Sequence, residues 1–238
     1  MNIERYFINC NYSYNEKRDI KYIVVHYTAG TTSKKGSALN TVKNVFNKPG
    51  ANASAHYVVD NISIVQCVED KDTAWHCGTN GTYYHKYCRN SNSIGIELCS
   101  NHDNFVSYEK NTARDKGWYF NPDTLNNGIK LIKYLSKKYN IPKENVLMHY
   151  DVTGKICPAP FINNGGWDNF IERIFTEDKE ERDDIMVYNK IEEVPEYARE
   201  IIKKYVNLGF IKGTDKGLEL TDEMIRIMVI IDRIIGGV

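Results

Sequence analysis

The sequence contains, at residues 22–27, the continuous apolar run Tyr22-Ile23-Val24-Val25-His26-Tyr27. A run of strand length without alternating polar residues is typical of a β-strand that is covered on both faces. The run therefore predicts a central strand of a buried sheet. His26, near the end of the run, is either an ordinary core histidine or a functional group, and other segments of the chain must decide between the two.

Further strand and helix patterns alternate on the C-terminal side of this run. The expected elements are, in chain order, a helix over 37–46, a β-hairpin over 55–68, a strand over 93–99, a helix over 122–139, a short strand over 145–149 and a helix over 167–175. Asn121-Pro122 supplies a cap and a first helical residue for the longest helix. This alternation predicts an α/β domain, and the amphipathic patterns after residue 190 predict a small helical module.

Composition limits the classes of partner. Acidic and basic residues balance, with 31 of each among 238 residues. This balance gives no support for binding to nucleic acid or to an anionic membrane. No apolar run approaches the roughly 20 residues that a membrane-spanning helix needs, so we expect no membrane insertion. The N-terminus lacks a basic region followed by an apolar one, and we therefore expect no signal peptide and synthesis in the cytoplasm.

Six cysteines are scattered along the chain without a tight framework. In a reducing compartment most of them should be small buried hydrophobic residues rather than disulfides. A bridge between Cys77 and Cys88 across the intervening loop remains an alternative.

A second segment, His149-Tyr150-Asp151-Val152-Thr153-Gly154-Lys155-Ile156-Cys157-Pro158, contains an imidazole, an amine and a thiol. We expect it to be a loop that follows the short strand at 145–149. Together with His26, the side chains of His149 and Cys157 offer three nitrogen and sulfur ligands, which suit Zn²⁺ and leave one position open for water. From spacing alone, a core histidine, a surface histidine and a buried thiol remain an equally simple interpretation.

Five short sequence motifs together resemble those of a known enzyme family. They are Val25-His26-Tyr27-Thr28-Ala29, Ser54-Ala55-His56-Tyr57, Ala74-Trp75-His76-Cys77-Gly78, Asn92-Ser93-Ile94-Gly95-Ile96-Glu97, and the segment from His149 to Pro158. In this order they resemble the zinc-dependent N-acetylmuramoyl-L-alanine amidases of the type-2 amidase and peptidoglycan-recognition-protein fold, which occur in bacteriophage endolysins and bacterial autolysins. The resemblance covers roughly residues 20 to 175.

The resemblance implies a central mixed β-sheet flanked by helices and a groove for bacterial peptidoglycan. It implies one Zn²⁺ per chain, bound by His26, His149 and Cys157, and hydrolysis of the amide between N-acetylmuramic acid and L-alanine. The alternative function is that of a non-catalytic peptidoglycan-recognition protein. Relatives that lack the cysteine ligand bind without cutting, so Cys157 argues against this alternative.

Two residues are candidates for the catalytic roles. Glu97 is an acid within an otherwise apolar strand and is the best candidate for the general base, although a solvated Glu at a strand end is the plain alternative. Lys155 precedes Cys157 by two residues and can place an ammonium at the developing oxyanion, although it can also be an ordinary loop lysine. Relatives carry a Glu and a Lys at these positions.

Four further residues are expected at the substrate, namely His56, Trp75, His76 and Asn92. Trp75 and His76 can line the groove, where an aromatic platform and an imidazole suit sugar and peptide. His56 follows a small residue on a neighbouring strand and can lie behind the metal ligands. Packing in the core is the alternative for both histidines.

The domain organisation expected from the sequence is a catalytic domain over 1–175, a charged linker over 176–189 and a helical module over 190–238. Leu208 to Gly213 and the segment that begins at Thr221 have a weaker similarity to S-layer-homology repeats and to wall-binding modules of endolysins. This similarity implies binding of a secondary wall polymer.

The final helix is apolar on almost every side, which predicts that it is covered. It either docks on the catalytic domain or pairs with the same helix of another chain. The charged linker favours separation from the catalytic domain, so we expect self-association through 190–238. An endolysin released from the host cytoplasm through a holin lesion fits these expectations best, and an autolysin exported by another route is second.

Overall fold

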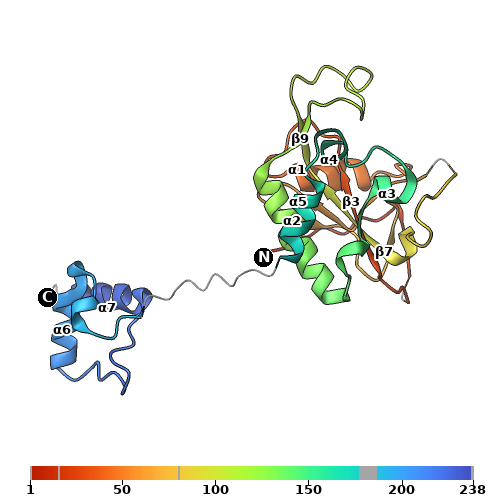
Figure 1. The fold of residues 1–238 in the computed structure, drawn as a ribbon. Helices are drawn as coiled ribbons and strands as arrows, with labels where there is room; N and C mark the ends of the chain where they lie inside the picture. The colour runs from red at the N-terminus through yellow and green to blue at the C-terminus, as the bar shows by residue number, and fades with distance from the viewer. Residues whose placement is uncertain (1, 16, 80, 177–186, 237–238) are drawn as a thin grey trace. The chain divides into compact units, whose positions relative to one another are not determined.

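The computed structural model describes residues 2–15, 17–79, 81–176 and 187–236. The chain separates into two compact units, Met1–Thr176 and Glu177–Val238 (Figure 1). Most of the expected charged linker falls on residues 177–186 and lies outside the described residues. The division into a catalytic domain, a linker and a wall-binding module therefore stays a prediction, and each unit is described by itself.

The N-terminal unit is built on a six-stranded sheet. In spatial order its strands are β1 (Glu4–Arg5), β5 (Ile64–Gln66), β4 (Tyr57–Val59), β7 (Ser93–Leu98), β3 (Tyr22–Tyr27) and β10 (Val146–Met148). Only β4 and β5 pair in an antiparallel sense, as the predicted hairpin. The other neighbours are parallel, so the sheet is mixed, as expected.

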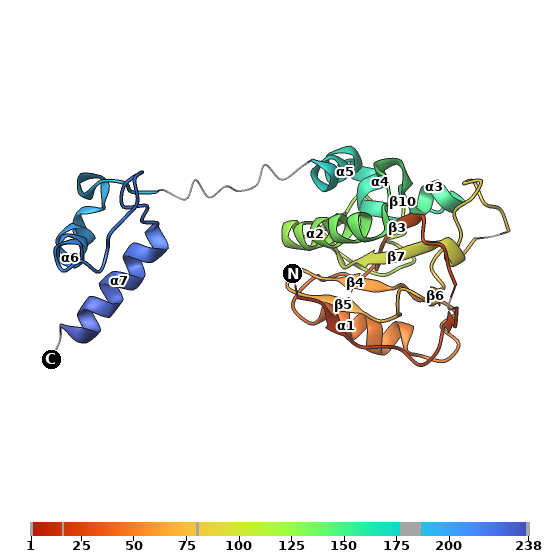
Figure 2. The ribbon, with the colours of Figure 1, turned by 90° about the horizontal axis from the view of Figure 1, so that it is seen from below.

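Helices cover both faces of this sheet, as the continuous apolar run in β3 predicts. Figure 2 shows α2, α4 and α5 on one side of the strands and α1 on the other. The helices of this unit are α1 (Ser37–Thr41), which continues as a wider turn over Val42–Phe46, α2 (Pro122–Tyr139), α3 (His149–Thr153), α4 (Ala159–Asn164) and α5 (Trp167–Phe175). In β4, Tyr57 and Val59 pack in the core with α2 and α5, whereas Val58 packs with α1.

The register of the parallel strands determines where functional side chains meet. His26 in β3 pairs directly with Glu97 in β7, and Val25 pairs with Met148 at the end of β10. The carboxyl ends of β3, β7 and β10 therefore lie at one edge of the sheet, where open α/β sheets usually bind ligands. His149, the first residue of α3, follows β10 directly at this edge.

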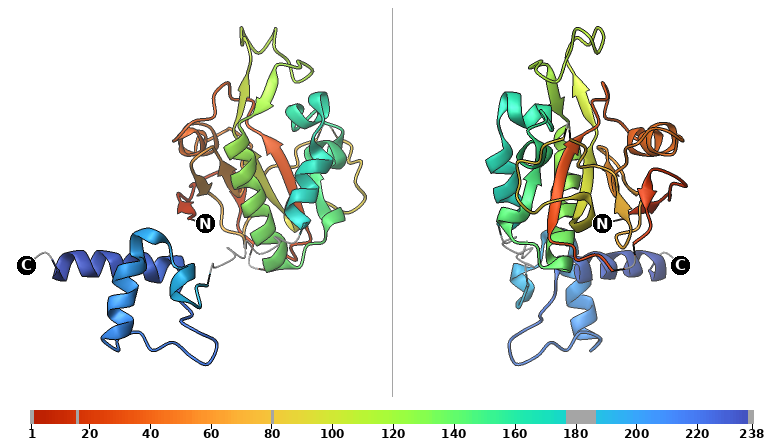
Figure 3. Two further views of the ribbon diagram at one scale, coloured as in Figure 1. Left: turned by 60° about the vertical axis from the view of Figure 1, so that its left-hand side comes forward. Right: turned by 90° about the vertical axis from the view of Figure 1, so that its right-hand side faces the viewer.

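Two small ribbons flank the main sheet. They are β2 (Tyr12–Ser13) with β6 (Thr73–Ala74), and β8 (Ser100–His102) with β9 (Trp118–Phe120). The connection from β8 to β9 protrudes beyond the sheet (Figure 3). All six cysteines are free thiols, and all but Cys10 are buried, so the alternative bridge between Cys77 and Cys88 is not formed. Among the described helices, none combines the length and hydrophobicity that a bilayer span requires.

The C-terminal unit contains the expected helical pair, α6 (Glu196–Asn207) and α7 (Asp222–Ile235). Thr221 caps α7 by accepting a hydrogen bond from the backbone N–H of Met224. Ile225 and Val229 of α7 pack into the small core of this unit. Ile227 and Ile230 remain more than half exposed, so the unit by itself leaves an apolar face of α7 uncovered.

We predict that Leu98→Ala destabilises the N-terminal unit by about 2–5 kcal/mol, because it leaves a cavity between β7 and α2. Leu98 is fully buried, and α2 approaches so closely that a Cβ at Gly128 would lie 2.9 Å from Leu98 Cδ2. Denaturant unfolding followed by tryptophan fluorescence measures this unit alone, because Trp75, Trp118 and Trp167 are the three tryptophans of the chain.

Ile62→Ala is the matched control, because Ile62 is 59% exposed at the hairpin turn. Its unfolding free energy should stay within about 0.5 kcal/mol of the wild type. Equal effects of the two substitutions would contradict the placement of Leu98 in the core.

Candidate metal centre and active-site groove

Three potential metal ligands meet at the carboxyl edge of the sheet. The candidate ligand atoms of His26, His149 and Cys157 all lie within 4.8 Å of one another, and all three side chains are buried. The expected loop at 149–158 begins instead with the short helix α3, because Asp151 caps it by accepting a hydrogen bond from the backbone N–H of Met148. The first turn of α3 presents His149, and the chain then returns to place Cys157 beside it.

The hydrogen bonds of the two imidazoles leave one nitrogen of each directed at this group. His149 Nε2 lies 3.0 Å from the carbonyl oxygen of Gly78, which can only accept, so Nε2 carries the proton. His26 Nε2 lies 3.1 Å from His76 Nδ1, and His26 Nδ1 lies 3.7 Å from Cys157 Sγ. Two Nδ1 atoms and one Sγ atom thus form a set of soft donors that fits Zn²⁺ and leaves a fourth position open.

Burial holds both histidines in the neutral form that binds metals. Desolvation is the largest cause that lowers the pKa of His26, and the charges of His149 and His76 act in the same direction. Desolvation also lowers the pKa of His149 to about 4, with a smaller contribution from Lys155. Burial raises the pKa of the Cys157 thiol, whereas a hydrogen bond from the backbone of Tyr27 lowers it.

Glu97 is placed next to this group by its pairing with His26. Its Oε2 is buried and has no hydrogen-bond partner among the described residues. Desolvation raises the pKa of Glu97 to about 8, and the charge of Lys155 opposes the shift. A carboxyl group with an unpaired oxygen and a raised pKa can accept and return a proton near neutral pH.

Lys155 is exposed, and its charge acts on the whole group. It lowers the pKa values of His26, His149 and Glu97, and Lys155 lines the same groove as these residues. A cation beside a buried donor set is suited to stabilise negative charge that develops there.

A groove of about 660 Å³ opens onto these residues. It is lined by His26, Tyr27, Thr28, Ala29, Phe46, Ala53, Ser54, Trp75, His76, Glu97, Thr112, Ala113, Arg114, His149, Lys155, Ile156 and Cys157. Trp75 donates its indole N–H to Ser13 Oγ at 2.9 Å, which fixes the ring in the groove wall. Arg114 and its neighbours come from the protruding connection between β8 and β9, and sequence analysis missed them because that segment contains none of the five motifs.

The structure corrects two of the residues expected at the substrate. His56 is fully buried, and its Nδ1 accepts a hydrogen bond from the backbone N–H of Gly95. Its Nε2 faces Arg18 and the carbonyl oxygen of Asp72, so no atom of the ring is free for substrate. Asn92 does not line the groove: its side chain holds its own loop by bonding the backbone of Arg89 and of Tyr87.

His76 lies at the groove but is not free to bind substrate with both nitrogens. It is 6% exposed, and its two ring nitrogens contact His26 and Ser93. Trp75 and His76 both line the groove. His76 also contacts the candidate ligand His26, and the substrate-binding role of both residues stays a prediction.

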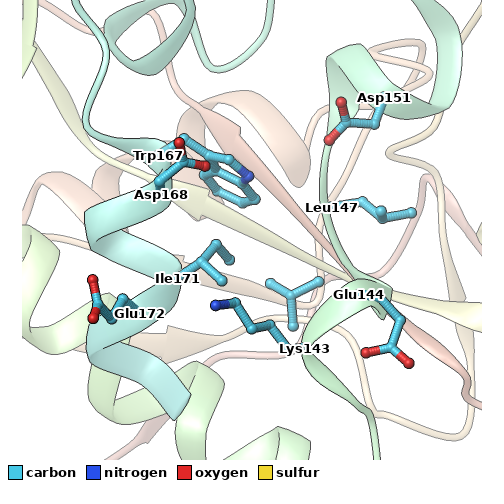
Figure 4. A pocket seen from close by; sticks show the side chains of 9 residues that line it. Lys143, Glu144, Leu147, Asp151, Trp167, Asp168, Ile171 and Glu172 are labelled. Atoms are coloured by element: carbon cyan, nitrogen blue, oxygen red, sulfur yellow. The ribbon is translucent and has the colours of Figure 1, made fainter. Parts of the chain in front are cut away.

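A second groove of about 700 Å³ lies elsewhere on the N-terminal unit (Figure 4). Trp167, Asp168, Ile171 and Glu172 of α5 form one wall and face Leu147 across it. None of the metal-ligand or catalytic candidates lines this groove, and among the described residues the group of potential metal ligands lies in the first groove instead.

Comparison with known proteins agrees with this geometry. The sequence profile of the N-acetylmuramoyl-L-alanine amidase family matches residues 16–160. The chain is 31% identical over 154 residues to the amidase CwlL of Bacillus licheniformis, covering 61% of this chain and 38% of that protein. It is 33% identical over 159 residues to the amidase CwlH of Bacillus subtilis, covering 66% of this chain and 54% of that protein.

Solved structures show the same fold. The structure of PlyL superimposes with a TM-score of 0.57 at 26% identity, covering 73% of this chain and 97% of PlyL. The catalytic domain of XlyA superimposes with a TM-score of 0.54 at 28% identity, covering 73% of this chain and 99% of that domain. The profile match spans more than half of the 238 residues, and it includes His26, Glu97, His149 and Cys157. The chain therefore belongs to the N-acetylmuramoyl-L-alanine amidase family.

Proposed function

We propose that the chain hydrolyses the amide bond between N-acetylmuramic acid and L-alanine in bacterial peptidoglycan, with one zinc ion per chain. The observation that carries this proposal is the buried donor set of His26, His149 and Cys157 beside the unpaired carboxyl oxygen of Glu97. The names of CwlL and CwlH as amidases support it. Because the chain spans only 38% and 54% of those two relatives, their activity is carried over here as a proposal.

The chain's own residues supply the proton transfers. The chemistry that zinc supplies in a site of this kind is Lewis acidity, which polarises an amide carbonyl and lowers the pKa of a water molecule. Glu97 accepts a proton from the attacking water and returns it to the leaving nitrogen. Desolvation raises the pKa of Glu97 and the positive charge of Lys155 lowers it, so the carboxyl group can hold a proton and return it near neutral pH.

Lys155 and Trp75 position the reaction. Lys155 lines the groove beside the donor set, so its ammonium can stabilise the negative charge that grows on the carbonyl oxygen. The ring of Trp75, fixed by its hydrogen bond to Ser13, offers an apolar surface at the groove for the sugar or peptide.

A non-catalytic recognition protein is the alternative function. Such a protein needs the groove but not a complete donor set or a buried acid with a raised pKa. The presence of Cys157 within reach of both histidines, together with the raised pKa of the buried Glu97 carboxyl group, favours catalysis.

We predict that the purified protein binds about one Zn²⁺ per chain and that Cys157→Ser loses both metal and amidase activity while the fold survives.

Glu97→Gln should keep zinc but lose turnover by about 10²–10⁴-fold, since it removes the general base. Lys155→Ala should behave like Glu97→Gln through loss of oxyanion stabilisation. Metal analysis and release of new alanine amino termini from purified peptidoglycan measure the two effects separately.

Cys10→Ser is the matched control, because Cys10 is a free thiol outside the donor set. It should keep wild-type zinc content and turnover. Full activity of metal-free protein would contradict zinc-dependent hydrolysis, and normal turnover of Glu97→Gln would contradict its role as the base.

For the C-terminal unit we propose self-association through an apolar groove of about 470 Å³. This groove is lined by Lys204, Tyr205, Leu208, Phe210, Ile211, Met228 and Ile231. Carbohydrate sites need several polar groups to bond hydroxyls, whereas Lys204 is the one charged residue of this lining. A secondary wall polymer is therefore the less supported ligand, although it is the one that the sequence similarity implies.

A second copy of the unit offers a surface of matching chemistry. Ile227, Ile230 and Ile234 are 56%, 56% and 69% exposed and form an apolar ridge on α7. Contact between the ridge of one copy and the groove of another would remove both apolar surfaces from water, which is the main driving force for such association.

We predict that the full chain sediments as a dimer or larger species at micromolar concentration and that Ile231→Lys makes it monomeric. The new ammonium would face Lys204 in the groove and would have to lose its hydration on association. Ile62→Lys, at an exposed position of the N-terminal unit, should sediment like the wild type. A strictly monomeric wild type would defeat the proposal.

An endolysin is our proposal for the biological setting, with the enzyme reaching the wall after release through a membrane lesion. Similarity to the solved structure described as a mutant endolysin from Bacillus subtilis supports it, with a TM-score of 0.55 and 28% identity.

A further inference from the structure

One face of β7 has a glycine, and so no side chain, beside the candidate metal ligand His26. Ser93, Gly95 and Glu97 alternate along this face, and His26 of β3 pairs with Glu97. A Cβ at Gly95 would lie 2.5 Å from Cγ of His76. The ring of His76 therefore rests directly on the backbone at Gly95, between Ser93 and the metal ligand.

A series of three hydrogen bonds passes through this ring and ends at a backbone carbonyl group. His76 Nδ1 lies 3.1 Å from His26 Nε2, and His76 Nε2 lies 3.2 Å from Ser93 Oγ. Ser93 Oγ in turn donates to the carbonyl oxygen of Arg89 at 2.6 Å. His26, His76 and Ser93 are all buried, so water does not compete for these bonds.

The carbonyl group of Arg89 determines which atom donates in each of these hydrogen bonds. A carbonyl oxygen only accepts, so the single proton of the Ser93 hydroxyl points at Arg89. Ser93 Oγ must then accept from His76 Nε2–H, which leaves the lone pair of a neutral imidazole on His76 Nδ1. Cys77 Sγ lies 3.3 Å from the same nitrogen, and a thiol can donate only a weak hydrogen bond to it.

We propose that His76 is a positioning residue that holds His26 in the tautomer with the proton on Nε2, so that the Nδ1 lone pair faces the metal. The inference rests on the proposed zinc site and goes beyond it, because it assigns a role to a residue outside the group of candidate metal ligands. Metal-binding histidines generally donate their second N–H to an acceptor that orients the ring, and loss of that acceptor lowers metal affinity.

The two histidine ligands differ in how this orientation is achieved. His149 donates to the backbone carbonyl of Gly78, which no substitution removes. His26 depends on a side chain, so its orientation can be tested by mutation. Gly95 is part of the same device, since any side chain there would displace the ring of His76.

The test compares His76→Leu with His76→Asn in the full chain. The two replacements have nearly the same shape, but only Asn retains an oxygen near the position of His76 Nδ1 that can accept from His26. We expect the zinc dissociation constant, measured by competition with a chromophoric chelator, to rise about 10–100-fold in the Leu variant. The Asn variant should recover most of that loss, and the visible spectrum of the cobalt-substituted protein should change in the Leu variant alone.

Thermal unfolding in excess chelator shows whether the two variants have the same metal-free fold. Equal zinc affinity of the Leu and Asn variants, whether both are weakened or both are unchanged, would overturn the role of His76. In either case the wild type still binds zinc, so the proposed hydrolytic function stands. Absence of zinc binding by the wild type would instead overturn the proposed function and this inference with it.

Discussion

The parallel pairing of β3 with β7 is the constraint on which the site depends. Its register places His26 opposite Glu97, so one ligand and the candidate base arise from a single backbone relationship. A shift by one residue would turn His26 to the other face of the sheet, where Ile23 and Val25 pack in the main core. The apolar residues that cover both faces thus determine the geometry of the polar ones.

Burial determines the protonation of the site, because removing an ionised side chain from water costs free energy. Desolvation is the first cause of the shifts that keep His26 and His149 neutral and that hold a proton on Glu97 up to a pKa of about 8. The same desolvation opposes formation of a Cys157 thiolate, which a divalent cation would favour strongly. A positive charge among these residues therefore favours the deprotonated form of both Cys157, a candidate ligand, and Glu97, the candidate base.

Much of the fold was predictable from the sequence because hydrophobic periodicity and capping residues are local signals. The strand at 22–27, the hairpin, and the helix that begins after Asn121 all appear where the pattern places them. The segment at 149–158 was predicted as a loop, because a five-residue helix held by the cap at Asp151 is too short to show a period.

The roles of His56 and His76 could not be predicted from local sequence patterns. His56 and His76 occur in motifs of similar appearance, and residue type alone suggests substrate contact for both. Their different positions depend on contacts with residues distant in sequence. Arg18 contacts His56, whereas His76 contacts the ring of His26, 50 residues away. No spacing rule contains these contacts, because they arise from how strands pair and not from how residues follow one another.

Gly95 carries functional information through the absence of a side chain. A glycine inside a strand weakens the strand, and it is tolerated where another group must approach the backbone closely. At Gly95 that group is the ring of His76, which occupies the volume that a Cβ would fill. Packing of the sheet and orientation of a metal ligand are therefore coupled at one position. A substitution that strengthens β7 at this point would do so at the expense of the site.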